Sequence, residues 1–175
     1  MSFNTYTVAG ALIAAGLVNS HAADGPALTA LLAGYEVWVP AVTPPMAAEI
    51  NAWARQLRGV FAAGDPGQRA DRADELLVAA SCSPRLVSHD GLPHHLHYAP
   101  LEASPPARVR ALTAAGLAQV IADGEGHRLG QCQREVCTEV FVDVSRNGLR
   151  RFCSVRCANV VNVSRHRARC RGTAG

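Results

Sequence analysis

Five of the six cysteines lie in the last 44 residues of this 175-residue chain, and four of them form two close pairs. The pattern is Cys132-x4-Cys137-x15-Cys153-x3-Cys157. Two thiol pairs separated by a loop are the frame of a four-thiolate zinc site. In a secreted protein such cysteines would instead form disulfides, whereas in a reducing compartment they more often bind metal, so both interpretations stay open. Four sulfur ligands saturate zinc and leave no position for a catalytic water, which predicts one structural Zn2+ per chain.

The residues around the pairs predict the elements that position them. Residues 140–144 alternate like a strand, Asn147-Gly148 is a strong two-residue hairpin signal, and residues 149–152 can form the returning strand. Ser154 is a suitable N-cap for a helix that continues to about residue 169. We therefore expect a treble-clef-like finger, with the first pair on a knuckle, Cys153 at the end of a hairpin and Cys157 in the first helical turn.

Charge is distributed unevenly along the chain. Residues 130–175 contain nine Arg and three acids, a balance of +6, whereas residues 1–129 contain eight Arg and eleven acids, a balance of −3. A basic helix with amide side chains suits phosphates and base edges, which predicts contact with double-stranded DNA. The candidate contacts are Arg146, Arg150, Arg151, Arg156, Asn159, Asn162, Arg165, His166, Arg167 and Arg169.

Two other interpretations of the basic helix remain. Every basic residue in the chain is Arg, so the charge could be an ordinary solvated face that reflects biased composition. Alternatively, the finger is a protein-interaction module that braces the fold or a homodimer, with Val160 and Val163 in an apolar contact. An enzyme is not expected, because the chain has no glycine-rich phosphate loop and no hydrolase signature.

The part before the finger predicts a mainly α-helical domain with one small β-hairpin, over residues 1–127, followed by the finger over 128–175. Apolar spacing, caps and prolines predict helices, and an Asp-Gly turn region predicts a hairpin of residues 85–88 with 94–98. The predicted helices cover residues 7–19, 24–32, 45–63, 68–80 and 106–122. His95 and His97 share one strand face and, with Asn19, are candidates for a small-molecule pocket.

Composition narrows the class of protein further. Hydrophobic residues make up 49% and charged residues 18%, which supports a folded core and excludes wholesale disorder. The apolar stretch of residues 8–18 is too short to span a bilayer and has no basic residue before it. We expect a soluble cytoplasmic protein without a membrane partner.

The run CQREVCTEVFVDVSRNGLRRFCSVRCANVVNVSRHRAR, residues 132–169, resembles the CGNR zinc finger. The preceding body resembles the ABATE domain, in residues 17–20, in the helix that carries Leu57 and Phe61, and in residues 95–98. The resemblance implies zinc on the four cysteines and a role as a DNA-binding transcription regulator, often described as stress-related. One departure stands out, because residues 157–160 are Cys-Ala-Asn-Val where the family has Cys-Gly-Asn-Arg. The missing arginine bears on nucleic-acid affinity rather than on metal binding.

Overall fold

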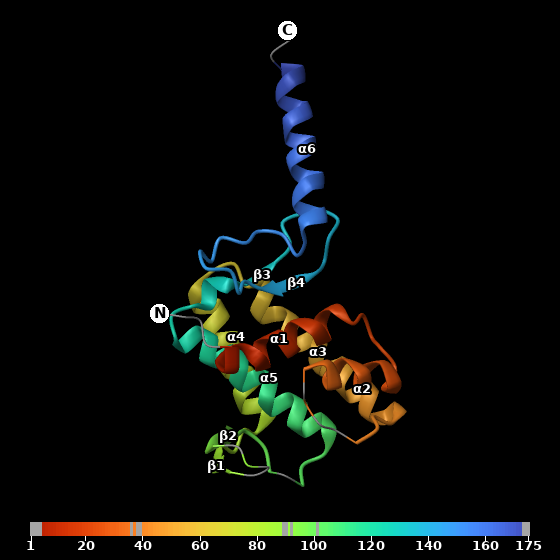
Figure 1. Cartoon of the computed structure of the whole chain (residues 1–175), viewed down its shortest axis with the longest axis vertical. Helices are drawn as coiled ribbons and strands as arrows, with labels where there is room; N and C mark the ends of the chain where they lie inside the picture. Colours follow the sequence, from red (N-terminus) through yellow and green to blue (C-terminus); the bar gives the residue numbers. More distant parts are fainter. Residues whose placement is uncertain are drawn as a thin grey trace.

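The computed structural model describes residues 5–35, 37, 40–88, 91, 93–100 and 102–172. In this part of the chain, six α-helices and two small antiparallel sheets form a helical body from which the last helix projects (Figure 1). In chain order the elements are α1 Thr5–Asn19, α2 Gly25–Gly34, α3 Pro44–Ala62, α4 Pro66–Ala80, β1 Arg85–Val87, β2 His95–His97, α5 Pro105–Ala122, the 3-10 turn η1 Gly126–Arg128, β3 Leu129–Gln131, β4 Val140–Val142 and α6 Val155–Gly172.

Helix starts follow the local signals in the sequence. Helices α2 to α5 each have proline in the first turn, where its missing N–H costs nothing. Asp24, Asp65 and Ser104 each accept a backbone N–H of the first turn through the side chain, at 2.9, 3.0 and 3.4 Å. Thr43 precedes α3 but makes no side-chain cap hydrogen bond. The predicted helices are thus confirmed, with ends that differ by a few residues.

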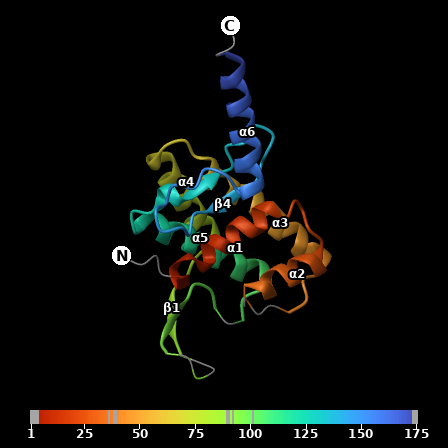
Figure 2. The same cartoon turned by 45° about the horizontal axis from the view of Figure 1, so that its top comes forward.

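Helices α1 and α5 make the most extensive contact between elements of the described structure. They lie side by side in both views (Figures 1 and 2). Glycines at the crossing allow this approach. A Cβ on Gly10 would lie 2.4 Å from the Leu112 carbonyl oxygen, and one on Gly116 would lie 2.5 Å from the Cα of Gly10. Backbone therefore packs directly on backbone, a contact that the sequence analysis did not predict.

The hydrophobic core of the body extends into the strands of the finger. Leu129, Val140 and Val142 are at most 3% exposed and belong to the same buried cluster as the core residues of α1 and α3. The β3–β4 hairpin therefore packs on the helices as part of one core. The two predicted units, residues 1–127 and 128–175, therefore share one core. Their division at residue 127 stays a prediction.

The two sheets test the strand predictions. β1 and β2 pair antiparallel, with Arg85 opposite His97 and Val87 opposite His95, as predicted; residues 89, 90 and 92 of the turn lie outside the described residues. The predicted pairing of residues 140–144 with residues 149–152 in the finger is wrong. β4 pairs with the preceding strand β3, Leu129 opposite Val142, whereas residues 149–152 form no strand.

The physical reason for this difference is the buried carboxylate of Asp143. Its two oxygens accept the backbone N–H groups of Ser145 and Arg150, at 2.9 and 2.7 Å, which folds residues 143–150 into a loop. Gly148 adopts the left-handed conformation within it (φ 63°) and lies against His127 and Arg128. The Asn-Gly signal thus marks a turn, but not a β-hairpin.

Helix α6 points away from the body, and its far end lies at the tip of the molecule (Figures 1 and 2). Among its described side chains, Cys157 is buried, those of Ala158 and Val161 are half-buried and the remainder are exposed. None of the described helices has the combination of length and apolar character that would let it cross a membrane.

Candidate metal centre

The first cysteine pair lies on the connection between β3 and β4. The N–H of Cys132 donates to the Glu139 carbonyl at 2.8 Å and extends the strand pairing by one step beyond Gln131. The N–H of Cys137 donates to the Arg134 carbonyl at 2.8 Å and closes a tight turn. The pair therefore sits on a knuckle, as predicted, and this knuckle forms the tip of the β3–β4 hairpin.

The second cysteine pair spans the start of α6. The Ser154 hydroxyl oxygen accepts the Cys157 N–H at 3.3 Å, and the Ser154 carbonyl accepts the Ala158 N–H at 3.1 Å. Ser154 is thus the N-cap of α6, as predicted. Cys153 precedes the cap and Cys157 lies in the first turn, so both thiols lie on the side facing the knuckle. A backbone hydrogen bond from Gln133 N–H to the Arg151 carbonyl, at 3.0 Å, joins the two halves.

The four sulfur atoms all lie within 4.8 Å of one another. The Sγ atoms of Cys137, Cys153 and Cys157 are 3.6, 3.7 and 3.9 Å apart. Tetrahedral zinc with Zn–S bonds of about 2.3 Å requires sulfur separations of about 3.8 Å. A disulfide requires about 2.05 Å, and all four cysteines are free. The cluster therefore fits one structural Zn2+, and the disulfide alternative is wrong.

A positively charged side chain lies beside the cluster. Arg134 Nη1 lies 3.8 Å from the Cys157 Sγ. In the metal-free protein, hydrogen bonds from Ser154 and then Arg134 lower the pKa of Cys157 to about 6, whereas burial is the main cause that raises the pKa of Cys153 to about 12. Zinc binding deprotonates its thiol ligands outright.

Arg150 braces the loop before α6. Its Nε donates to the Phe152 carbonyl at 2.9 Å, its Nη2 to the Cys153 carbonyl, and its guanidinium lies 4.8 Å over the Phe141 ring. Arg151 Nε donates to the Gln133 side-chain oxygen at 2.7 Å. The charge of these two residues led to their prediction as phosphate contacts. Their hydrogen bonds show that they also hold the finger together.

The other predicted DNA contacts lie on α6, except Arg146, which lies on the loop after β4. Arg156, Asn159 and Asn162 are exposed on α6, and Arg146 is exposed on the loop after β4. Arg165, Arg167 and Arg169 are exposed toward the far end of the helix, while the side chain of His166 lies outside the described residues. The structure therefore brings the predicted set to one end of the molecule, with no acidic residue in α6.

Residues predicted for a small-molecule pocket do not converge. Asn19 binds the backbone of Val140 through both ends of its amide, donating to the carbonyl at 3.0 Å and accepting from the N–H at 2.9 Å. His95 and His97 lie on β2, at the end of the body remote from β4, and their Nε2 atoms are 3.0 Å apart (Figure 1). The prediction of one pocket shared by Asn19, His95 and His97 is therefore wrong.

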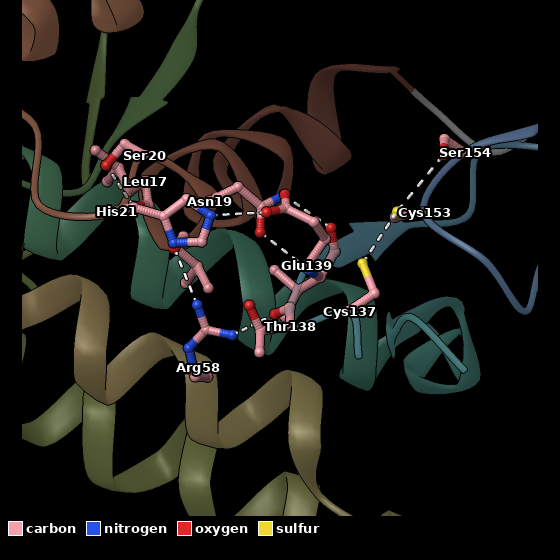
Figure 3. Close-up of polar contacts among 12 residues, drawn as sticks. Leu17, Asn19, Ser20, His21, Arg58, Cys137, Thr138, Glu139, Cys153 and Ser154 are labelled. Atoms are coloured by element: carbon pink, nitrogen blue, oxygen red, sulfur yellow. Dashed lines mark hydrogen bonds and ion pairs between the residues drawn. The ribbon is translucent and has the colours of Figure 1, made fainter. Parts of the chain in front are cut away.

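Further side chains join the finger to the body (Figure 3). Arg58 Nη1 donates to the Thr138 carbonyl at 2.5 Å, and Nη2 donates to the Val18 carbonyl at 3.1 Å. His21 Nε2 lies 2.7 Å from a Glu139 carboxylate oxygen. Neither residue is predicted from the sequence, because no local pattern signals a contact across 80 or 118 positions.

The fold and the sulfur cluster define a zinc finger domain of the four-cysteine class. Residues 128–170 match the model of the CGNR zinc finger family, over about a quarter of the chain. This match bears out the predicted resemblance of the finger, whereas the ABATE resemblance of the body stays a prediction. No curated protein matches the chain.

Proposed function

We propose that the chain is a transcription regulator that binds double-stranded DNA through α6, with residues 1–127 as a sensing or dimerising domain in the cytoplasm. The observation that carries this proposal is the placement of α6. The first turn of α6 is tied to the sulfur cluster, and the 18-residue helix, which has five Arg and no acid over its whole length, projects from the body. Because the four sulfurs saturate the metal, the proposed function is binding and not catalysis.

The dimensions and chemistry of α6 suit a groove of DNA. Eighteen helical residues extend about 27 Å, and the major groove admits an α-helix. Exposed Arg156 and Arg165 can neutralise phosphates, and exposed Asn159 and Asn162 can read base edges. Zinc fixes the direction in which the helix leaves the body, which is what a reading helix needs.

Fluorescence anisotropy with zinc-loaded protein and duplex DNA tests the proposal. Binding should weaken steeply with salt, because each neutralised phosphate contributes about 0.9 to the slope of log K against log salt. Arg156→Ala and Arg165→Ala should each weaken binding and reduce the slope. Arg85→Ala, an exposed change of the same charge on β1, is the matched control and should change neither. Absence of binding to any duplex, or salt-independent binding, would contradict the proposal.

A protein-interaction module is the second candidate, favoured by valines on the projecting helix. Val155, Val160 and Val163 are 76, 46 and 49% exposed. A helix that stands alone in water is marginal, so a partner surface would stabilise α6. Light scattering separates the two functions. A dimer that Val160→Ser and Val163→Ser convert to monomer, in a protein without DNA affinity, would favour this candidate.

A further inference from the structure

The histidine pair of β2 lies at the end of the body remote from the zinc finger (Figure 1). His95 and His97 occupy alternate positions of the strand, so both side chains lie on one face of the hairpin, and exposed Leu96 lies on the other. Their Nε2 atoms are 3.0 Å apart, their ring centroids are 4.9 Å apart and the ring planes are inclined by 54°. The two half-buried residues therefore bring a pair of imidazole nitrogens together.

The backbone of the hairpin holds this pair in place. Strand β2 pairs with β1 along its whole length, and Arg85 lies opposite His97. Beyond the paired strands, the Ser83 N–H donates to the Tyr98 carbonyl at 3.0 Å. Two ligands that a folded strand has already positioned lose little conformational entropy when they bind.

A carbonyl group orients the ring of His95. Its Nδ1 lies 2.9 Å from the carbonyl oxygen of Pro93. A carbonyl oxygen only accepts, so Nδ1 carries the proton and the Nε2 of the neutral ring has the lone pair. Histidines that bind metal through one ring nitrogen almost always donate the other N–H to a group of this kind. The hydrogen bond therefore leaves a potential ligand atom on the side of the ring that meets His97.

Two nitrogen atoms at this distance fit one metal ion. With metal–nitrogen bonds of about 2.0 Å, neighbouring ligands are about 2.8 Å apart on a tetragonal ion and about 3.3 Å apart on a tetrahedral ion. The observed 3.0 Å lies between these values. Imidazole suits zinc, copper and nickel, whereas calcium and magnesium take oxygen ligands. Among the first group, Cu2+ has the highest affinity for a given site.

The described residues supply two side-chain ligands at this place. Within this part of the chain, no third cysteine, histidine or carboxylate completes a set of three with the pair. The charged residue opposite His97, Arg85, is exposed, so its guanidinium can extend into water and away from a bound cation. Water or an added ligand would take the other positions of the metal.

We propose that His95 and His97 together bind one divalent transition-metal ion, Cu2+ most tightly, so that the helical body has a metal site of its own. This site differs from the zinc cluster in chemistry as well as in place. Two imidazoles leave coordination positions open, whereas four thiolates saturate zinc. The proposal does not depend on the proposed DNA binding.

Electron paramagnetic resonance on the untagged, zinc-loaded full chain without DNA tests this proposal. The probe is Cu2+ in complex with iminodiacetate, because this chelator leaves positions open for imidazoles and keeps free copper away from the thiols. One complex should bind per chain, and its spectrum should show two imidazole nitrogens. The count is made on wild-type protein, so it does not depend on whether a variant folds. Elemental analysis should show that the zinc is retained.

His95→Ala and His97→Ala should each weaken binding of the complex about 100-fold, because the loss of one imidazole turns a two-point contact into a single one. His94→Ala, an exposed change next to the strand, is the matched control and should bind as wild type does. Ni2+ and Zn2+ in the same complex should bind more weakly than Cu2+.

Four results would overturn the proposal. The first is a spectrum with fewer than two imidazole nitrogens, and the second is unchanged affinity in either strand variant. The third is an equal loss of affinity in His94→Ala, which would place the metal elsewhere on the hairpin. The fourth is release of zinc with copper bound by sulfur. Binding of Zn2+ as tight as that of Cu2+ would overturn the choice of metal.

Discussion

Asn19 and Val140 exchange two hydrogen bonds across 121 positions of the chain, so that the side-chain amide of α1 pairs with the backbone of β4 as a neighbouring strand would. β4 has β3 on one edge, and Asn19 satisfies polar groups that β3 does not use. Together with Arg58 and His21, this contact attaches the metal-binding finger to the helical body.

Asn19→Ala should therefore destabilise the protein. It leaves the N–H and carbonyl of Val140 without partners in a region of little solvent, at a cost of about 2 kcal/mol. The expected fall in melting temperature is about 4–8 °C, measured by calorimetry on zinc-loaded protein. Asn159→Ala, on an exposed position of α6, is the control and should shift it by little. An unchanged melting temperature for Asn19→Ala would show that water replaces the amide.

Zinc removal should loosen the finger and leave the body folded. Elemental analysis should give one zinc per chain for wild type, and far less for Cys153→Ser. After chelation, hydrogen exchange should accelerate in residues 132–137 and in α6, because the buried contact of α6 is Cys157. Exchange in α1 and α5 should change little. The Cys82→Ser variant should still bind one zinc per chain, because Cys82 lies outside the cluster. Loss of zinc from this variant would contradict the assigned site.

Asp143 should stabilise the loop by a nearly constant amount between pH 6 and 8. Burial raises the pKa of this carboxyl, but hydrogen bonds from Ser145 and Arg150 and the charge of Arg128 outweigh it, so the net shift is downward. A lowered folded-state pKa means that the stabilisation is complete above the unfolded value of about 3.9 and is lost as pH falls through the lower folded value.

Asp143→Ala should then cost about 3 kcal/mol in urea unfolding at pH 6, 7 and 8 alike, because two backbone N–H groups lose a charged acceptor. Asp143→Asn retains one acceptor oxygen and should cost less. A cost that grows steadily from pH 6 to 8 would contradict the direction of the pKa shift.

Gly116→Ala should disrupt the crossing of α1 and α5. The added Cβ would lie 2.5 Å from the Cα of Gly10, where only backbone movement can relieve the clash, so we expect a loss of about 1–3 kcal/mol or more. Gly34→Ala is the matched control, because no atom lies within 4 Å of its added Cβ. Equal melting temperatures for the two variants would show that the crossing can adjust freely.

Val160→Arg introduces the arginine that the CGNR motif has at this position and tests the proposed DNA function. Position 160 is exposed on α6 near Arg156, so the new charge should strengthen duplex binding and steepen the salt slope by about 0.9. Val163→Arg adds the same charge one turn further along. If both variants bind equally well, the gain reflects total charge and not the position that the motif specifies.

Local patterns in the sequence determined much of this protein. The helices follow apolar spacing, proline and cap residues, and the four-sulfur site follows from cysteine spacing, because each signal acts between residues that are close along the chain. Ser154 as the cap of α6 is such a case: its hydroxyl meets the N–H of a residue three positions away.

The tertiary structure decided the rest. β4 pairs with β3 because Asp143 captures the N–H groups of the loop after it, and α1 approaches α5 because two glycines meet across the body. Asn19 binds the finger instead of lining a pocket. Helix α6 projects from the body, and its described side chains beyond Val161 are exposed. These relationships join residues far apart in the chain. Whether such residues meet depends on how the whole core packs, which no short window of sequence contains.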